Sequence, residues 1–238
     1  MSTPVRPAYH IYRWIWTGLD WLYPPRCAGC GQLGSRWCAN CQASVKRLVP
    51  PLCPICSQPV GNSGICGLCR ASKPRIRQVR AWGCFDGSLR QAIHALKYRR
   101  DVALGEVLSA HLVELLMELG WGLDLVIPVP LGMARLKARG YNQADILAFP
   151  LALMTGLTHK PHALKRTRET HTQVGLSLAS RHANVQGAFT ADDDVVAGKR
   201  VLVIDDVITT GATMHACASA LMQVGAKDVY GLALARAV

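Results

Sequence analysis

The stretch of residues 201–214, VLVIDDVITTGATM, constrains the fold more than any other part of the chain. Its first four residues are apolar β-formers, and an unbroken run of this kind is typical of a strand buried on both faces of a parallel sheet. Two acids, Asp205 and Asp206, precede a Thr/Gly loop, and the alanine-rich segment after that loop favours a helix. The sequence therefore predicts an α/β fold with a ligand site between the carboxyl end of this strand and the amino end of the helix.

The loop after the acids has the composition of a phosphate-binding loop. The amino end of a helix offers unpaired N–H groups and a partial positive charge, so an anion fits there. Gly211 allows the backbone to approach a ligand closely, and hydroxyl donors come from Thr209, Thr210 and Thr213. The paired carboxylates suit the two hydroxyls of a ribose, or Mg2+ reached through water.

Three other interpretations of this stretch exist. The plain alternative is a buried strand before a capped helix, with Asp205 and Asp206 as surface acids. A P-loop requires G-x-x-x-x-G-K-[ST], and the chain has no such stretch. A phospho-receiver domain usually opens with its acidic pair, whereas this pair lies near the end of the chain.

Composition and charge divide the chain into two parts. The 238 residues have room for one or two domains, and 50% of them are hydrophobic, which is typical of a globular protein. The net charge is +12, but residues 1–80 hold 11 Lys and Arg against one acid, whereas residues 81–238 hold 16 against 14. A basic N-terminal part indicates a polyanion partner, with nucleic acid the first candidate. Alternatively, the positive charge of residues 1–80 balances eight zinc-bound thiolates, which would lower the net charge of these residues to about +6.

The N-terminal residues do not have the pattern of a signal peptide. No uncharged run is long enough to span a bilayer, and residues 1–25 lack the apolar core and cleavage site of a signal peptide. We therefore expect a cytoplasmic protein without a membrane span.

Eight of the ten cysteines form four C-x2-C pairs, and all eight lie within residues 27–69. Two such pairs close one tetrahedral zinc site, so four pairs predict two Zn2+ ions held by Cys27, Cys30, Cys38, Cys41, Cys53, Cys56, Cys66 and Cys69. Pro50-Pro51 resembles a joint between two units and favours consecutive pairing, although a cross-braced arrangement and a redox relay stay open. Four thiolates leave no free coordination position, so both ions are expected to be structural.

The remaining pattern predicts an N-terminal helix in residues 1–25, a double zinc ribbon in 26–70 and an α/β domain in 79–238. The N-terminal helix has an apolar face, expected to pack on the body of the protein or on a partner. Strands are expected at 79–86, 124–130 and 227–235, and helices at 88–98, 102–119 and after Asn142. A basic loop is expected between the strand at 124–130 and Asn142, and a long cationic loop at 164–189 is typical of a lid.

Taken together, these motifs resemble the ComF/GntX family of bacterial phosphoribosyltransferase-like proteins. The resemblance covers about residues 20–236 and is carried by the four C-x2-C pairs, HALKY, IPVPL, RGYNQ and VLVIDDVITTGATM. It implies a double zinc ribbon followed by a type I phosphoribosyltransferase fold, and a part in natural competence or the use of imported DNA. No reaction is tied to the family, so the resemblance does not identify an acceptor.

The resemblance also implies roles for individual residues around phosphoribosyl pyrophosphate (PRPP). Asp205 and Asp206 would hold the ribose hydroxyls, and the 5′-phosphate would be bound by Thr209, Thr210, Gly211, Ala212 and Thr213. Pyrophosphate, with Mg2+, would meet Arg135, Arg139 and Lys97. The stretch 166–173 would be the loop that closes over the site.

Two functions follow. The first is a phosphoribosyltransferase, in which a nucleophilic acceptor displaces pyrophosphate from PRPP. The second is a non-catalytic scaffold that binds PRPP or a related nucleotide, while the zinc module binds single-stranded DNA and other competence or DNA-uptake proteins act as partners. For DNA binding we expect a stacking surface at Trp37. The phosphates would meet Arg36, Arg47, Arg70, Lys73, Arg75, Arg77 and Arg80.

Overall fold

The computed structural model describes residues 7–61, 64–168 and 187–238. Its centre is a five-stranded parallel sheet in the order β1-β7-β6-β2-β3. These strands are β1 (Gln78–Cys84), β7 (Asp228–Arg236), β6 (Arg200–Ile208), β2 (Leu125–Pro128) and β3 (Thr158–His159). A separate antiparallel pair joins β4 (Leu164–Arg166) to β5 (Phe189–Ala191).

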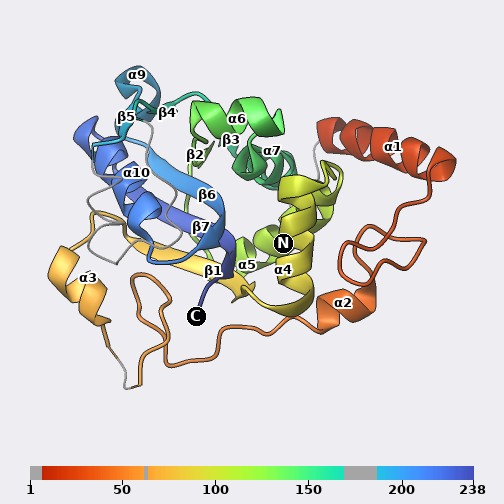
Figure 1. Ribbon diagram of the computed structural model, residues 1–238. Coiled ribbons are helices and arrows are strands. Elements are labelled where there is room, and N and C mark those ends of the chain that lie inside the picture. Colours follow the sequence, from red (N-terminus) through yellow and green to blue (C-terminus); the bar gives the residue numbers. More distant parts are fainter. Residues whose placement is uncertain (1–6, 62–63, 169–186) are drawn as a thin grey trace.

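The strand predicted around the acidic pair is β6, and it lies in the middle of the sheet. It pairs in parallel with β2 from Leu125↔Val201 and with β7 from Arg200↔Asp228. Val201, Leu202, Val203 and Ile204 are fully buried, because helices cover both faces of the sheet (Figure 1). The prediction that this apolar run is a strand buried on both faces of the sheet is therefore confirmed.

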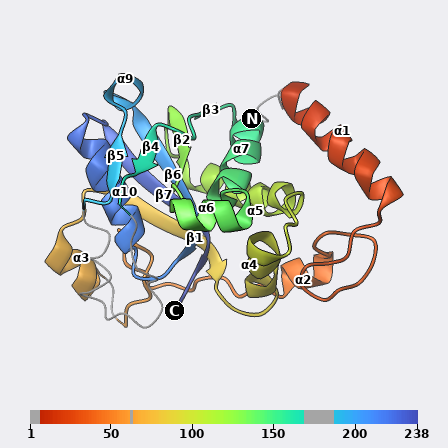
Figure 2. The ribbon, with the colours of Figure 1, turned by 45° about the horizontal axis from the view of Figure 1, so that its top comes forward.

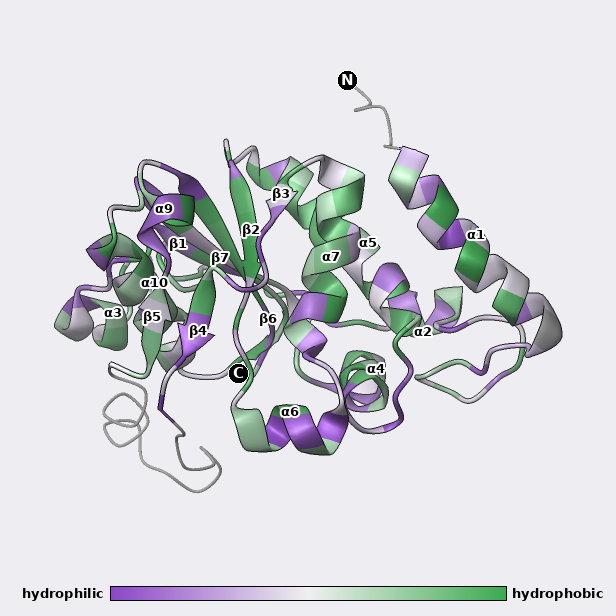
Figure 3. Cartoon of the chain, turned by 90° about the horizontal axis from the view of Figure 1, so that it is seen from above, coloured by the Kyte–Doolittle hydropathy of each residue, from purple (hydrophilic) through white to green (hydrophobic). Residues whose placement is uncertain are grey.

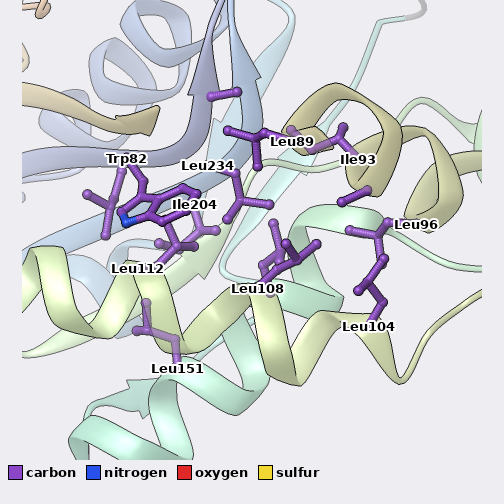
Figure 4. Packing of buried hydrophobic residues seen from close by; sticks show 14 of the residues in the cluster. Trp82, Leu89, Ile93, Leu96, Leu104, Leu108, Leu112, Leu151, Ile204 and Leu234 are labelled. Atoms are coloured by element: carbon purple, nitrogen blue, oxygen red, sulfur yellow. The ribbon is translucent and has the colours of Figure 1, made fainter. Parts of the chain in front are cut away.

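One face of the sheet is covered by three helices, α4 (Gly87–Tyr98), α5 (Leu104–Leu119) and α7 (Gln143–Thr155). Figure 4 shows leucines of these helices packing on Ile204 of β6 and Leu234 of β7. The helices α5 and α7 approach closely at Gly105, where a side chain would meet Ile146. Ser109 strengthens this contact, since its hydroxyl donates to the carbonyl of Leu147 at 2.8 Å.

The opposite face is covered mainly by α10 (Ala212–Gln223), which packs Met214, Cys217 and Leu221 on the sheet. Two short helices, α6 (Met133–Arg139) and α9 (Asp193–Val196), follow β2 and β5 respectively. Figure 3 shows β2 as a largely hydrophobic strand and α6 as a helix with many hydrophilic residues. The prediction of a basic loop between β2 and Asn142 is wrong, because residues 133–139 form a helix.

The N-terminal region adds three helices, α1 (Pro7–Leu22), α2 (Ala39–Ala43) and α3 (Gly67–Ser72). Figure 2 shows α2 beside α4, whereas α3 lies on the side of the sheet that carries α10. Cys27, Trp37 and Cys41 belong to the same hydrophobic cluster as α4, α5 and α7. The first ribbon therefore shares its core with the sheet domain.

Helix α1 faces the body with a different set of residues from the one we expected. Tyr9 donates to Glu106 at 2.9 Å, and the ring of Tyr12 meets that of Phe149 edge-on. The predicted apolar face points away instead, with Trp14 79% and Ile11 65% exposed. Of the two expected uses of that face, packing on the body is therefore wrong, whereas contact with a partner stays a prediction. Among the described residues, no helix has the length and hydropathy needed to cross a membrane.

Candidate functional site

The acidic pair and the Thr/Gly loop lie at the carboxyl end of β6. Asp205 and Asp206 are the sixth and seventh residues of the strand, and the loop leads directly into α10. Gly211 caps this helix with φ +80°, a conformation that favours glycine. The Thr210 side chain accepts a hydrogen bond from Ala212 N at 3.2 Å. This bond satisfies one N–H group of the helix end and fixes the shape of the loop.

A cavity of about 770 Å³ opens at this end of the sheet, between the β6–α10 loop, the end of β2, α6 and the end of α4. Nine of the ten residues expected to bind PRPP line it. They are Lys97, Arg135, Arg139, Asp205, Asp206, Thr209, Gly211, Ala212 and Thr213. The tenth, Thr210, is buried within the loop. The structure therefore brings together segments that lie more than a hundred residues apart.

Asp205 and Asp206 have different surroundings although they are neighbours. Asp206 is buried, and its Oδ2 forms an ion pair with Nζ of Lys97 from the last turn of α4. Asp205 accepts a hydrogen bond from Asp206 N at 2.8 Å. Burial raises the pKa of the Asp205 carboxyl well above its usual range, and the neighbouring Asp206 carboxylate adds to that increase. The pair therefore does not carry two equally available negative charges.

The RGYNQ motif joins the elements around the cavity. Arg139 donates to Oε1 of Gln143, and its guanidinium lies 5.5 Å from the centre of the Tyr98 ring. Tyr141 donates its hydroxyl to the carbonyl of Leu96. Asn142 donates to the carbonyl of Val129 at 2.9 Å and accepts from Ala144 N, which caps α7 as predicted. These bonds hold α4, α6, α7 and the end of β2 together.

Further residues that we did not predict for the site also line the cavity. The polar ones among them are Tyr98, Arg100, Gln143 and Arg166. Tyr98 is the residue after the predicted Lys97 and Arg100 lies three positions after it, so the basic run at the end of HALKY was the available signal. Arg166 ends β4 and was expected only as the start of a closing loop, most of which lies outside the described residues. The lining thus carries four arginines and one lysine against two acids, a balance that favours an anionic ligand.

The cysteines form two groups of four that follow the chain order, as consecutive pairing predicted. They are Cys27, Cys30, Cys38 and Cys41 in the first, and Cys53, Cys56, Cys66 and Cys69 in the second. Sγ atoms lie 3.7 Å apart for Cys30 and Cys38, and 3.6 Å for Cys56 and Cys66. A tetrahedral ion with Zn–S bonds of about 2.3 Å separates its sulfurs by about 3.8 Å, so both groups fit zinc.

Backbone N–H groups prepare one thiol of each group to become a thiolate. Cys38 N lies 3.3 Å from Sγ of Cys27, and Cys66 N lies 3.4 Å from Sγ of Cys53. Burial by itself raises the pKa of the Cys27 thiol, but N–H donors, led by that of Cys38, lower it to about 6. The same opposing effects lower the pKa of Cys53 to about 6. This donor chemistry suits a metal that binds thiolates.

The expected DNA-stacking role of Trp37 is wrong, because this side chain is 2% exposed and packs edge-on against Trp82. Several of the expected phosphate contacts also have partners inside the protein. Arg36 pairs with Asp20 and Asp101, Arg47 lies over the Trp82 ring, and Arg80 donates to the carbonyl of Pro54. Four of that set, Arg70, Lys73, Arg75 and Arg77, are exposed in α3 or in the segment that follows it.

Two protein-family models match the two parts of the chain. Residues 18–70 match the model of the double zinc ribbon domain, and residues 138–236 match that of the phosphoribosyl transferase domain. A solved glutamine PRPP amidotransferase from B. subtilis aligns with a TM-score of 0.43 and 22% identity, over 60% of this chain and 30% of that one.

Two curated relatives are similar over most of their length. The DNA utilization protein YhgH of Salmonella typhi is 32% identical over 210 residues, which are 85% of this chain and 92% of the relative. Competence protein F of Haemophilus influenzae is 29% identical over 208 residues, 84% of this chain and 90% of the relative. The expected fold, a zinc-ribbon module followed by a type I phosphoribosyltransferase domain, is confirmed. The chain belongs to the family of competence protein F and YhgH.

Proposed function

We propose that this protein binds PRPP together with Mg2+ in the cavity at the end of β6, and that it serves in natural competence or the use of imported DNA. The observation that carries the proposal is the convergence of an acidic pair, a Thr/Gly loop at a helix end and several basic side chains around one cavity. The names of the relatives, a DNA utilization protein and a competence protein, support the cellular role.

Each part of PRPP has a chemically suitable counterpart in the cavity. The 5′-phosphate fits the amino end of α10, where Thr209 and Thr213 add hydroxyls to the backbone N–H groups. The ribose hydroxyls fit the carboxylates at Asp205 and Asp206. The pyrophosphate fits Arg135 and Arg139, whose guanidinium groups suit phosphate oxygens.

Mg2+ would be held chiefly by the phosphates of the ligand, with the acidic pair as its protein partner. The carboxylate oxygens are donors that Mg2+ prefers, and one carboxylate is already paired with Lys97. The ion would supply charge neutralisation on the pyrophosphate.

As an enzyme, the protein would transfer the phosphoribosyl group to a nucleophilic acceptor. The bond between C1 of the ribose and the pyrophosphate oxygen breaks, the acceptor forms the new bond to C1, and the acceptor gives up a proton. Positive charge develops on the ribose during this step. Asp205 and Asp206 would stabilise that charge, and Arg135 and Arg139 would stabilise the departing pyrophosphate.

The second function, a non-catalytic PRPP-binding scaffold that binds single-stranded DNA, is supported by a different surface. Arg70, Lys73 and Arg75 are exposed next to one another along α3 and the segment that follows it. With Trp37 buried, contact with DNA would rest on phosphate charges, so binding should weaken steeply as the salt concentration rises.

The test is calorimetric titration of the zinc-loaded protein with PRPP, with and without Mg2+, followed by measurement of pyrophosphate release with a panel of bases and with DNA. Turnover supports the enzyme, and binding without turnover supports the scaffold. Replacing both acids (Asp205→Asn with Asp206→Asn) should abolish Mg2+-dependent binding while the protein stays folded. The matched control changes the exposed acids (Asp192→Asn with Asp193→Asn) and should bind normally. Normal affinity in the first variant would show that the pocket is misassigned.

A further inference from the structure

Lys97 lies in the cavity against Asp206, a residue proposed to bind the ribose hydroxyls of the ligand. It lies in the last turn of α4, and its side chain reaches Oδ2 of Asp206, 109 positions further along the chain. The contact is largely shielded from water, since the two side chains are 19% and 5% exposed. An ion pair at such a place is much less weakened by solvent than a pair on the surface.

Without this lysine, the acidic pair would attract a divalent cation. The Asp206 carboxylate and the adjacent Asp205 carboxyl group offer the oxygen ligands that Mg2+ and Mn2+ prefer. The ammonium of Lys97 forms an ion pair with Oδ2 of Asp206 and would repel a metal cation from the same oxygen. Four arginines on the cavity wall, at positions 100, 135, 139 and 166, add to that repulsion.

We propose that Lys97 is a built-in counter-ion that keeps divalent cations away from Asp205 and Asp206 until an anionic ligand enters the cavity. The lysine side chain is a mobile point charge on a four-carbon stem, so it can turn from the carboxylate to a phosphate oxygen. That movement would release Asp206 for the ligand hydroxyls and the metal. The cation and the phosphate-bearing ligand would therefore enter cooperatively. The identity of this ligand rests on the function proposed above, whereas the block on cations does not.

The experiment measures Mn2+ binding by electron paramagnetic resonance, on the full zinc-loaded chain and without any phosphate ligand. Mn2+ prefers oxygen ligands, so it leaves the thiolates to zinc. Lys97→Gln should bind Mn2+ at least about tenfold more tightly than the wild type does, because the substitution removes one positive charge that repels the ion. Lys97→Arg keeps the charge and should bind as weakly as the wild type. Lys97→Gln with Asp206→Asn should lose the gain.

Zinc content and the midpoint of thermal unfolding show whether each variant is folded. If Lys97→Gln does not fold, Lys97→Met is measured in its place. Equal Mn2+ affinity in the wild type and a folded Lys97→Gln protein would overturn the proposal. So would a gain of the same size in Lys97→Arg. Since PRPP is absent from these titrations, its failure to bind the wild type would count against the proposed function and leave the Mn2+ result intact.

Discussion

Arg236 and Gln58 join the last strand of the sheet to the second zinc ribbon. Arg236 is completely buried at the end of β7, and its Nε and Nη2 donate to Oε1 of Gln58 at 3.1 and 2.6 Å. Its Nη1 donates to the carbonyl of Cys56 at 2.7 Å. Four thiolates around one Zn2+ carry a net negative charge. The buried guanidinium therefore compensates that charge, and its hydrogen bonds also hold the second ribbon against the sheet.

Replacing Arg236 by Met should therefore destabilise the protein and loosen the second zinc. The change leaves a half-buried acceptor on Gln58 and a buried one on Cys56 without donors, and we expect a loss of about 2–4 kcal/mol in the free energy of unfolding. Urea unfolding and zinc content after chelation measure the two effects. Arg77→Met is the matched control, because Arg77 is 66% exposed with a distant partner, and it should change stability by less than about 0.5 kcal/mol. Equal stability of the two variants would contradict this account.

The elements that local pattern defines were predictable, and β6, its loop and α10 are the best example. An apolar run, an acidic pair and a Gly/Thr turn all lie within fourteen residues, so each feature supports the same local structure. Helix α6 was missed because it has no buried residue and follows two prolines, which left no apolar periodicity to detect.

The family resemblance predicted that Lys97, Arg139 and Asp206 meet at one ligand, but the direct contacts among the site residues were not predictable. No local pattern pairs Lys97 with Asp206, or shows that Gln143 accepts a hydrogen bond from Arg139. The helical spacing of Ile11, Trp14 and Ile15 showed that they share a face of α1, but spacing does not tell which way a face points. In α1, Tyr9 and Asp20 turn inward, where Glu106 and Arg36 respectively are their polar partners.

Substitution of two basic residues of α6 can distinguish a direct contact with the ligand from an effect of the overall surface charge. Arg139 lines the cavity, whereas Lys137 is exposed outside it. Arg139→Ala should weaken PRPP binding by about tenfold or more, since a hydrogen bond to a charged group contributes roughly 1.5–3 kcal/mol. Lys137→Ala should change the affinity by less than about twofold. Calorimetry of both variants checks this, and similar losses in the two would mean that only the overall charge matters.

Two helical glycines should respond in opposite ways to the same substitution. A Cβ on Gly105 would lie 2.3 Å from Cγ2 of Ile146 and 2.7 Å from its carbonyl oxygen, so Gly105→Ala forces α5 away from α7. We expect it to cost about 1–3 kcal/mol of stability. Gly18 in α1 has nothing within 4 Å of that position, and Gly18→Ala should be neutral or stabilising by up to about 1 kcal/mol. Urea unfolding distinguishes them, and a neutral Gly105→Ala would show that the helices can separate freely.

The two zinc ribbons should lose their metal at different rates. Cys30 of the first group is exposed, whereas all four cysteines of the second are buried. A chelator should therefore release zinc in two phases, with the first ribbon giving the fast one, because its thiolate can be reached from solvent. Cys30→Ser should remove the fast phase and leave the slow one. Cys84→Ser, which changes a cysteine outside both groups, should keep both phases. A single phase in the wild type, or a fast phase that survives in Cys30→Ser, would mean that exposure of the ligands does not control release.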